Sequence, residues 1–432
     1  MTGPADAGGA HRRRSSAPGE APAGGAPVAG ASLASDPDAR PPSMSAALVP
    51  RARPHWLVND GILLAVAVVG GLAHAVLLLG WPVINPLNLE WLKGDPAAHY
   101  LGWAFYRHER HWGFPLTWTT RLGYPVGVSI AFQDSIPLIA IPLRWLSPIL
   151  PEPFQYLGLY ATLALVLQMY FGLLLCRRLC NAHPLFTYAG GVLILLAPVL
   201  TRRLHGHFAL ASHWLVLASL WACVRATPTP PIVRALWPFF VLLVVAGAIH
   251  PYLAAQGLLI ALAAAARVIL LDRSRWKAVV GVSLLLGGAL ALSLTVSGFL
   301  GSLEWSAYRS EGFGLFSLNL LGPFNPTGLA HLLPELPVAH PFQRFEGYSY
   351  LGAGIIAVLL VTLVVHRRRV LSLFGRADVR SSSWPSCARS PPHPRPSPWA
   401  PMPSPASGSR DSSICSGPPF ERRGACSGPR TT

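Results

Sequence analysis

Side chains suited to acid–base or phosphate chemistry gather in one segment, residues 89–134, which lies between two strongly apolar regions. The segment carries Asp95, His99, Arg107 and Asp134, together with many aromatic residues. Carboxylates act as general bases or metal ligands, and arginine and histidine neutralise phosphates. Loops of more than about 15 residues inside a compact body are usually functional or disordered, and the aromatic content argues against disorder. We therefore expect this segment to carry chemistry.

Two further groups of polar residues lie later in the chain. Arg202, Arg203, His205 and His207 cluster at one predicted helix junction. A second long loop, at residues 301–347, supplies five more charged residues: Glu304, Arg309, Glu311, Arg344 and Glu346. Acids placed near such cations suit a substrate that carries a phosphate.

Several of these residues also have a purely structural interpretation. Asp95 stands directly before Pro96, so it can simply cap a helix that begins at the proline. His99, Trp103 and Tyr106 fall on one face at helical spacing, which an aromatic belt at the membrane surface would explain without chemistry.

The histidines near the later helix ends have alternatives as well. His205 and His207 are two residues apart, which is a weak signal for a metal site, and phosphate recognition or an interfacial location explains them better. His250 precedes Pro251 at a helix break, where its ring can satisfy a freed backbone group.

The surrounding chain is that of a polytopic membrane protein. It is 52% hydrophobic and only 12% charged, with a mean hydropathy of +0.42, which excludes an ordinary soluble domain. The net charge of +16 comes largely from the tails and from short basic clusters beside apolar runs. Such clusters are typical of membrane topology signals, so no nucleic-acid partner is predicted. Six cysteines show no zinc-finger spacing.

The apolar runs predict an all-α bundle of about eight membrane-spanning helices with two long outer loops, because lipid leaves backbone groups no partner except the helix itself. The runs fall at about 60–83, 154–176, 184–200, 208–224, 235–250, 252–271, 278–300 and 348–365. The segment 135–150 is short and contains three prolines, so we interpret it as a re-entrant or interfacial helix.

Orientation follows from the basic clusters, which lie at alternate helix ends and are expected on the cytoplasmic side. This places residues 84–134, the segment 202–207, the corner at His250 and the loop 301–347 on the outer face. A phosphate-bearing lipid in the outer leaflet is then the expected substrate. Arg202 and Arg203 form an exception to the rule, a basic pair left outside.

The two ends are expected to lie outside this body. Residues 1–53 and 378–432 are rich in Pro, Ser, Gly, Ala and Arg, a composition that cannot bury a core. We predict a disordered N-terminal tail, a membrane domain over 54–377, and a C-terminal tail that is disordered or translated out of frame.

Five strings resemble a family of bacterial polytopic membrane proteins, in order and at natural spacing over about 56–370. They are GDPAAHYLGWAFYRHERHWGFPL at 94–116, GVSIAFQDSIPL at 127–138, HGHFALASHW at 205–214, SLNLLGPFNP at 317–326 and FEGYSYLGAG at 345–354. That family in turn resembles the GT-C glycosyltransferases, which use sugars linked to lipid phosphates. This chain departs from those enzymes after Arg369, where they continue, so an out-of-frame tail would imply an inactive fragment.

The resemblance implies sugar transfer from a polyprenyl-phosphate donor at the outer face of the bacterial cytoplasmic membrane. Asp95 matches the acidic motif of the first outer loop and would be the general base or a ligand of a divalent metal, with Asp134 as the second acid. The expected substrate-binding residues are His99, Arg107, Arg202, Arg203, His205, His207, Glu346 and Tyr348. A transporter or flippase of lipid-linked sugars is the alternative, but the runs carry almost no charge at their centres and show no internal repeat.

Overall fold

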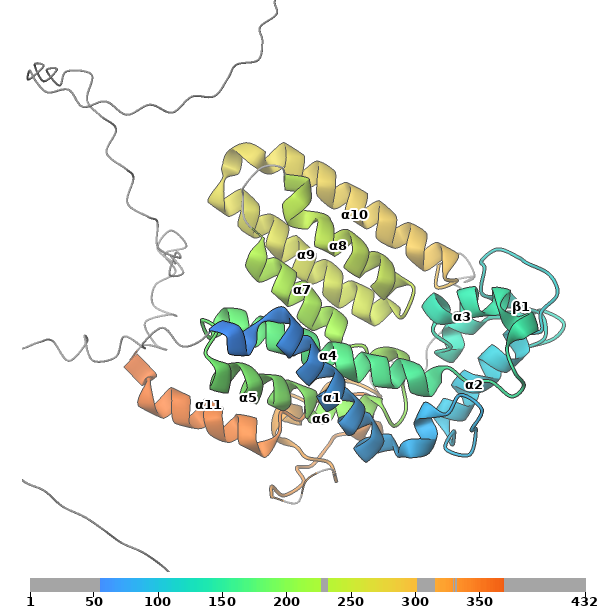
Figure 1. Ribbon diagram of the computed structural model, residues 1–432, viewed down its shortest axis with the longest axis horizontal. Helices are drawn as coiled ribbons and strands as arrows, with labels where there is room; N and C mark the ends of the chain where they lie inside the picture. The colour runs from blue at the N-terminus through green and yellow to red at the C-terminus, as the bar shows by residue number, and fades with distance from the viewer. Residues whose placement is uncertain (1–54, 227–231, 301–314, 329, 331, 369–432) are drawn as a thin grey trace, which may run out of the picture. The chain divides into compact units, whose positions relative to one another are not determined.

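A computed structural model describes residues 55–226, 232–300, 315–328, 330 and 332–368 of the chain (Figure 1). The tails predicted at 1–53 and 378–432 lie outside these residues, as do Glu304, Arg309 and Glu311. The chain divides into two compact units, and the division falls after Ile356. All the candidate site residues lie in the first unit, and helix α11 (Ala353–Val365) crosses the boundary and is described only by itself.

Five helical stretches are long and apolar enough to cross a membrane among the described residues. They are α1 (Asp60–Leu79), α4 (Leu157–Leu179), the broken helix Pro184–Arg203, α9 (Pro251–Leu271) and the stretch Arg273–Val296. Each has 20 to 24 residues, and about 20 residues at 1.5 Å each cover the hydrocarbon core. The prediction of a mostly helical protein is confirmed, and these five candidate spans agree with the prediction of a membrane protein.

All eight apolar runs form helices, but three of these are shorter than a full span. They are Ala209–Arg225, Ile232–Gly247 and Ala353–Val365, between 10 and 17 residues long. The broken helix consists of α5 (Pro184–Leu195) and α6 (Pro198–Arg203), interrupted at a proline that cannot continue the first helix. The count of eight spans therefore stays a prediction.

The helices pack in a continuous series within the first unit. Helix α1 lies on α4, α4 contacts α5 and α7 (Trp214–Arg225), and α8 (Ile232–Gly247) packs on α9 and α10 (Trp276–Val296). Small residues make the closest approach: a Cβ on Gly71 would lie 2.5 Å from the Cα of Val166. The buried stripe of α1 consists of Leu63 and three small residues, Ala67, Gly71 and Ala75. Small residues are expected at such interfaces because lipid provides no hydrophobic driving force between helices.

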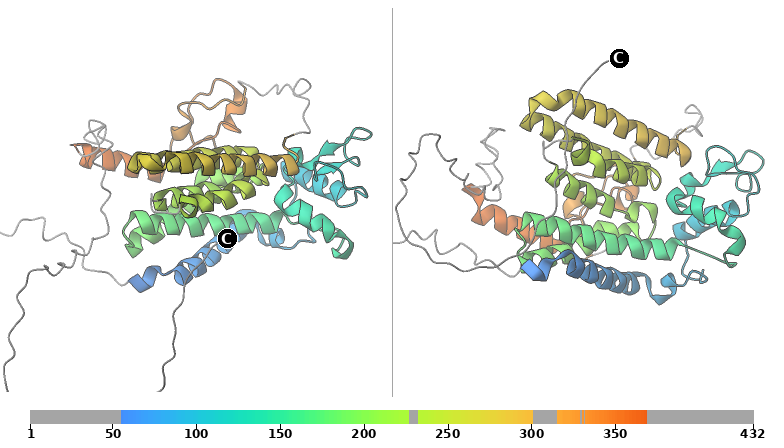
Figure 2. Two further views of the ribbon diagram at one scale, coloured as in Figure 1. Left: turned by 90° about the horizontal axis from the view of Figure 1, so that it is seen from above. Right: turned by 45° about the horizontal axis from the view of Figure 1, so that its top comes forward.

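The first long loop is ordered and lies beyond one end of the helices, as the cyan elements show in Figures 1 and 2. It contains α2 (Asp95–Tyr106) and the 3-10 turn η4 (Ile130–Gln133), and the 3-10 turn η3 (Trp81–Ile84) leads into it from α1. Strands β1 (Trp118–Thr119) and β2 (Val128–Ser129) pair antiparallel, with Trp118 opposite Ser129. The all-α prediction is therefore corrected by one small two-stranded ribbon.

Helix α3 (Pro137–Trp145) agrees with the interpretation of 135–150 as a helix that does not cross the membrane. It has nine residues with Pro142 inside, and nine residues reach about 14 Å of the roughly 30 Å required. Arg144 fixes it by donating to the carbonyls of Glu109 and His111, at 2.7 and 2.8 Å. The same guanidinium lies 3.8 Å from the ring centre of Trp112, so α3 is tied to the loop that follows α2.

The second long loop is described from residue 315 onward. It contains η8 (Gly322–Phe324) and η9 (Pro341–Arg344), and Asn325 and Gln343 hold its backbone together through side-chain hydrogen bonds to Leu336 and Ala339.

At the opposite end of the helices, Arg177 pairs with Asp60 at 2.6 Å.

We predict that both long loops face the outside of the cell. Cysteine introduced at Tyr124 or Leu320, whose side chains are 84% and 88% exposed, should react with a membrane-impermeant maleimide in intact cells. Ser274→Cys, beside the basic residues between α9 and α10, should react only after permeabilisation, because that turn carries the positive-inside signal. All three variants are made in a cysteine-free background, and the reverse labelling pattern would overturn the orientation.

Candidate functional site

The turn that carries Asp134 is held in an unusual backbone conformation. Asp134 and Ile136 have φ of 52° and 49°, a left-handed region that aspartate tolerates but a β-branched residue reaches only at a cost of about 1–3 kcal/mol. Two side-chain hydrogen bonds hold the turn in this conformation. Ser135 Oγ donates to the carbonyl of His99 at 2.7 Å, and the Tyr156 hydroxyl donates to the carbonyl of Ser135. The turn therefore presents the Asp134 carboxylate in a fixed direction.

His99 clamps this turn to the segment that follows α6. Its Nδ1 lies 2.7 Å from the carbonyl oxygen of Gln133, and its Nε2 lies 2.7 Å from that of Gly206. The interpretation of His99, Trp103 and Tyr106 as an interfacial aromatic belt is wrong, because all three side chains are buried inside the protein. Each is hydrogen-bonded to a carbonyl, so this face of α2 builds the protein interior.

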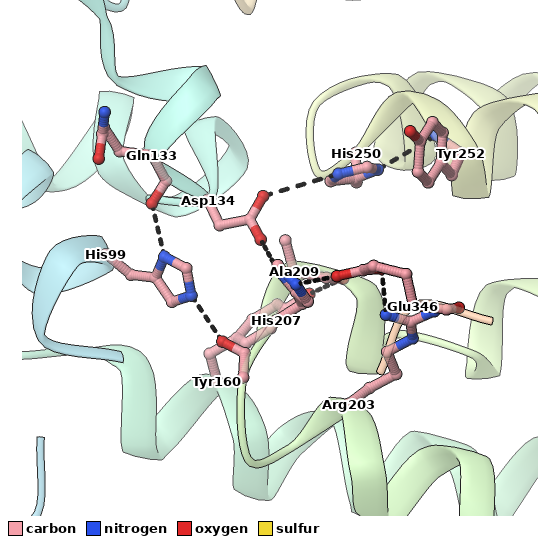
Figure 3. Close-up of polar contacts among 11 residues, drawn as sticks. His99, Gln133, Asp134, Tyr160, Arg203, His207, Ala209, His250, Tyr252 and Glu346 are labelled. Atoms are coloured by element: carbon pink, nitrogen blue, oxygen red, sulfur yellow. Dashed lines mark hydrogen bonds and ion pairs between the residues drawn. The ribbon is translucent and has the colours of Figure 1, made fainter. Parts of the chain in front are cut away.

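Four charged side chains form the centre of the site, and we call them the His207 cluster: Asp134, Arg203, His207 and Glu346 (Figure 3). The His207 ring lies between two carboxylates, with Nδ1 3.1 Å from Asp134 Oδ2 and Nε2 2.6 Å from Glu346 Oε1. Arg203 donates to the other Glu346 oxygen at 2.9 Å and to the Glu346 carbonyl at 3.1 Å. The cluster joins three segments that are far apart in the sequence.

These contacts fix the charges of the cluster. Hydrogen bonds to Asp134 and Glu346 raise the pKa of His207 to about 10, and the hydrogen bond from His207 lowers the pKa of Glu346 to about 2. Burial opposes ionisation of Asp134, but the His207 hydrogen bond and the neighbouring His250 lower its pKa nonetheless. At neutral pH the cluster thus holds two carboxylates, one imidazolium and one guanidinium, and its charges balance.

His250 adds a neutral imidazole to the same site. Its Nδ1 accepts a hydrogen bond from the backbone N–H of Tyr252 at 3.1 Å, so Nε2 carries the proton and faces Asp134 Oδ1 at 3.6 Å. Burial lowers the pKa of His250. The expected backbone role of this histidine is confirmed, because its ring caps the first turn of α9.

Two cavities open beside the cluster. The larger has a volume of about 900 Å³ and includes His99, Asp134, His250 and several aromatic rings in its wall. The smaller has a volume of about 340 Å³ and includes Arg202 and His205. Five residues line both cavities: Asp95, Arg203, His207, Phe316 and Glu346.

Asp95 is not the helix cap that its position before Pro96 suggested. Helix α2 begins at Asp95 itself, its N-cap is Gly94 with φ of 65°, and no side chain caps it. A Cβ built on Gly206 would lie 3.4 Å from Asp95 Oδ2, so the carboxylate lies against that backbone. Asp95 is exposed, and its carboxylate accepts no hydrogen bond from the described residues, in contrast to the two carboxylates of the cluster.

The side chains of the other predicted substrate-binding residues, Arg202, His205 and Arg107, make different contacts. The Arg202 guanidinium lies 4.8 Å from the ring centre of Phe345 and makes no hydrogen bond within the described residues. His205 is exposed, and its Nδ1 contacts the carbonyl of Thr201. Arg107 is buried and donates to the carbonyls of Pro151, Leu150 and Ser147. Its place outside both cavities does not fit the predicted substrate contact.

Tyr348 also lies outside both cavities. The residue is 6% exposed, and burial raises its pKa to about 12. Glu346, two residues earlier in the chain, lines both cavities, so only one of these two predicted residues reaches the site.

Comparison with known protein families matches residues 67–386 to a domain of unknown function, DUF6311. This match covers well over half of the chain. The chain belongs to the DUF6311 family. No curated protein and no solved structure matches it. The membership agrees with the resemblance to a family of polytopic membrane proteins, and the further link to GT-C enzymes stays a prediction.

In this DUF6311 site, the residues that lie close enough together to bind the predicted divalent metal do not offer free ligands. His99, Asp134 and His207 offer ligand atoms within 4.8 Å of one another, a donor set that suits zinc-like ions. However, both nitrogens of His99 already face carbonyl oxygens, and both nitrogens of His207 already face carboxylates. To bind an ion, each histidine would have to turn a ring nitrogen away from the oxygen that it now faces, so the three residues do not fit a metal as they stand.

Sequence reasoning missed part of the cavity wall. His250 was assigned only a backbone role, and Phe132, Gln133, Tyr252 and Phe316 were not selected at all, yet each lines the large cavity. The sequence offered position as the only signal for these residues: Phe132, Gln133 and Tyr252 lie beside predicted helix ends on the outer face. Distinguishing a cavity wall from a membrane-surface residue required the fold.

We predict that the His207 cluster makes thermal stability depend on pH in a particular direction. The His207 pKa is about 10 when folded and about 6.5 when unfolded, so its stabilisation is complete below pH 6.5 and is lost as pH rises toward 10. The melting temperature of the purified protein should fall between pH 6.5 and 9. His207→Gln should flatten this slope, whereas His108→Gln, an exposed histidine paired with Glu152, should retain it. Equal slopes in the wild type and His207→Gln would refute the charge assignment.

Proposed function

We propose that this protein is a membrane glycosyltransferase that moves a sugar from a polyprenyl-phosphate donor to an acceptor on the outer face of the bacterial cytoplasmic membrane. The observation that carries the proposal is the position of Asp95. It is an exposed carboxylate without a hydrogen-bond partner among the described residues, at the junction of two cavities, one of which holds Arg202.

Asp95 is the best candidate for the general base among the three carboxylates of the site. A base must be free to accept a proton, and Asp134 and Glu346 are committed to His207, with their pKa values lowered by that contact. Asp95 would take the proton of an acceptor hydroxyl, whose oxygen then forms a bond to the sugar C1 while the bond from C1 to the donor phosphate oxygen breaks. Asp134, predicted as a second catalytic acid, instead serves to position His207.

Arg202 is the best candidate for binding the donor phosphate. Because the charges of the His207 cluster balance, Arg203 and His207 have little charge left for a substrate. Arg202 keeps its hydrogen-bond donors free within the described residues and lines the small cavity with His205. Guanidinium groups bind phosphates through paired hydrogen bonds, and the leaving polyprenyl phosphate needs such a partner. Phe342 and Phe345, both more than 40% exposed beside it, offer apolar contact to the lipid.

The position of the charged residues relative to the candidate membrane spans favours transfer over transport. A transporter of lipid-linked sugars would place paired charges near the middle of the membrane. Within the His207 cluster, Asp134, His207 and Glu346 instead lie outside the five candidate spans, and Arg203 is the last residue of one of them. This placement supports chemistry at the membrane surface.

We predict that Asp95→Asn abolishes transfer of labelled sugar from a polyprenyl-phosphate donor in membranes. Removing a positioned base costs about 10²–10⁴ in rate. The Asp95 carboxylate makes no hydrogen bond to a described residue, so the substitution removes only its favourable interaction with the N-terminus of α2, about 0.3–1 kcal/mol, and the melting temperature should fall only slightly. Glu152→Gln is the matched control, since Glu152 is an exposed carboxylate in the same region, outside both cavities. Full activity of Asp95→Asn would exclude Asp95 as the base.

The two neighbouring arginines should respond differently to substitution. Arg202→Gln should raise KM for the donor about tenfold or more while leaving the melting temperature unchanged, because its donors face the cavity. Arg203→Gln should destabilise the fold by about 1.5–3 kcal/mol, the usual contribution of a hydrogen bond to a charged group, because it removes a partner of Glu346. Donor KM and thermal unfolding are measured on both variants, and an unstable Arg202→Gln with unchanged KM would contradict the division of roles.

A further inference from the structure

The wall of the large cavity contains exposed aromatic rings that the proposed chemistry does not use. Phe132 and Tyr252 line this cavity, and their side chains are 45% and 65% exposed. Neither ring lines the small cavity beside Arg202. Large apolar rings left open beside charged groups in a concave site are a common feature of ligand recognition.

Both rings are held in place from behind. Phe132 packs edge to face on Phe299, with ring centres 6.2 Å apart and planes at 83°, and Phe299 itself is 6% exposed. Tyr252 packs against His250 at 4.9 Å and 65°, and His250 is fixed by its hydrogen bond to the Tyr252 backbone. Rings fixed in this way bind a ligand at little entropic cost.

Free polar groups lie in the same wall. The Gln133 side-chain amide, the Tyr252 hydroxyl and the Asp95 carboxylate make no hydrogen bond within the described part of the chain, and all three residues line the large cavity. An amide supplies two donors and an acceptor, a phenol supplies one of each, and a carboxylate accepts. The wall therefore offers flat apolar faces with polar groups of both kinds beside them.

We propose that the large cavity is the acceptor site and that it binds a saccharide. A pyranose ring has an apolar C–H face, which stacks on an aromatic ring, and hydroxyls around its edge, which pair with amides and carboxylates. Tyr252 and Phe132 supply the stacking faces, and Gln133 and Asp95 bind the hydroxyls. The assignment rests on the proposed function, which requires an acceptor hydroxyl next to Asp95, and it names the acceptor class that the proposed function leaves open.

The other occupant with an affinity for aromatic rings is the prenyl chain of the donor. Filling the large cavity with hydrocarbon would cover Gln133, Asp95 and the imidazole of His250 without supplying any hydrogen bond. Burying polar groups without partners costs free energy for each group covered. The composition of the wall thus favours the saccharide.

The test measures ligand binding and does not depend on transfer. The full-length protein in lipid nanodiscs is titrated with methyl glycosides of glucose, galactose, mannose and N-acetylglucosamine, and with maltose, by saturation-transfer NMR. At least one of these should bind, and Tyr252→Ala should weaken its binding about two- to tenfold, the range expected from loss of one ring contact. Tyr252→Phe should retain most of the affinity. Tyr124→Ala, an exposed tyrosine outside both cavities, should retain all of it.

Farnesyl phosphate, a short donor mimic, distinguishes the two proposals. Its binding should be weakened by Arg202→Gln and unaffected by Tyr252→Ala. Absence of binding by every saccharide, or weaker farnesyl phosphate binding in Tyr252→Ala, would overturn the saccharide site in favour of a lipid-filled cavity. Saccharide binding that responds to Tyr252→Ala, in a protein that transfers no sugar, would sustain the site while removing the proposed activity.

Discussion

The imidazolium of His207 is the interaction on which the site depends. It lies between Asp134 and Glu346, so it joins the end of the first long loop to the end of the second, through a segment that follows α6. Half-buried carboxylates are costly unless they are paired. The histidine therefore stabilises both carboxylates, Glu346 together with Arg203, and the histidine in turn stays charged because both are present. Loops that share no secondary structure are thereby held around common cavities.

The membrane body was predictable from the sequence because lipid imposes a simple rule. Backbone groups must bond within their own segment, so every apolar run of the chain forms a helix. The ordered first loop was also foreseen from its aromatic content. The β1–β2 ribbon was not, since two residues per strand leave no alternation to detect, and the broken helix α5–α6 was interpreted as one span.

The sequence predicted many of the residues that form the site, but it did not predict what each residue does there. Arg107 and Arg202 carry the same guanidinium, and only the fold shows that one donates to three carbonyls while the other faces a cavity. His99 was selected for substrate contact, yet both of its nitrogens face backbone oxygens. Sequence patterns reveal which groups can bind a phosphate or move a proton. They do not reveal which of these groups the protein itself already satisfies.

That distinction organises the chemistry of the site. The balanced His207 cluster forms a wall whose charges are satisfied, with Arg203 and His207 unable to attract an anion strongly. Asp95 and Arg202 are opposite charges that the described residues leave unpaired, and they line one small cavity together. A substrate with a phosphate at one end and an acceptor hydroxyl approaching from the other side would satisfy both at once. The satisfied charges therefore supply a rigid frame, and the unsatisfied pair supplies the reactive positions.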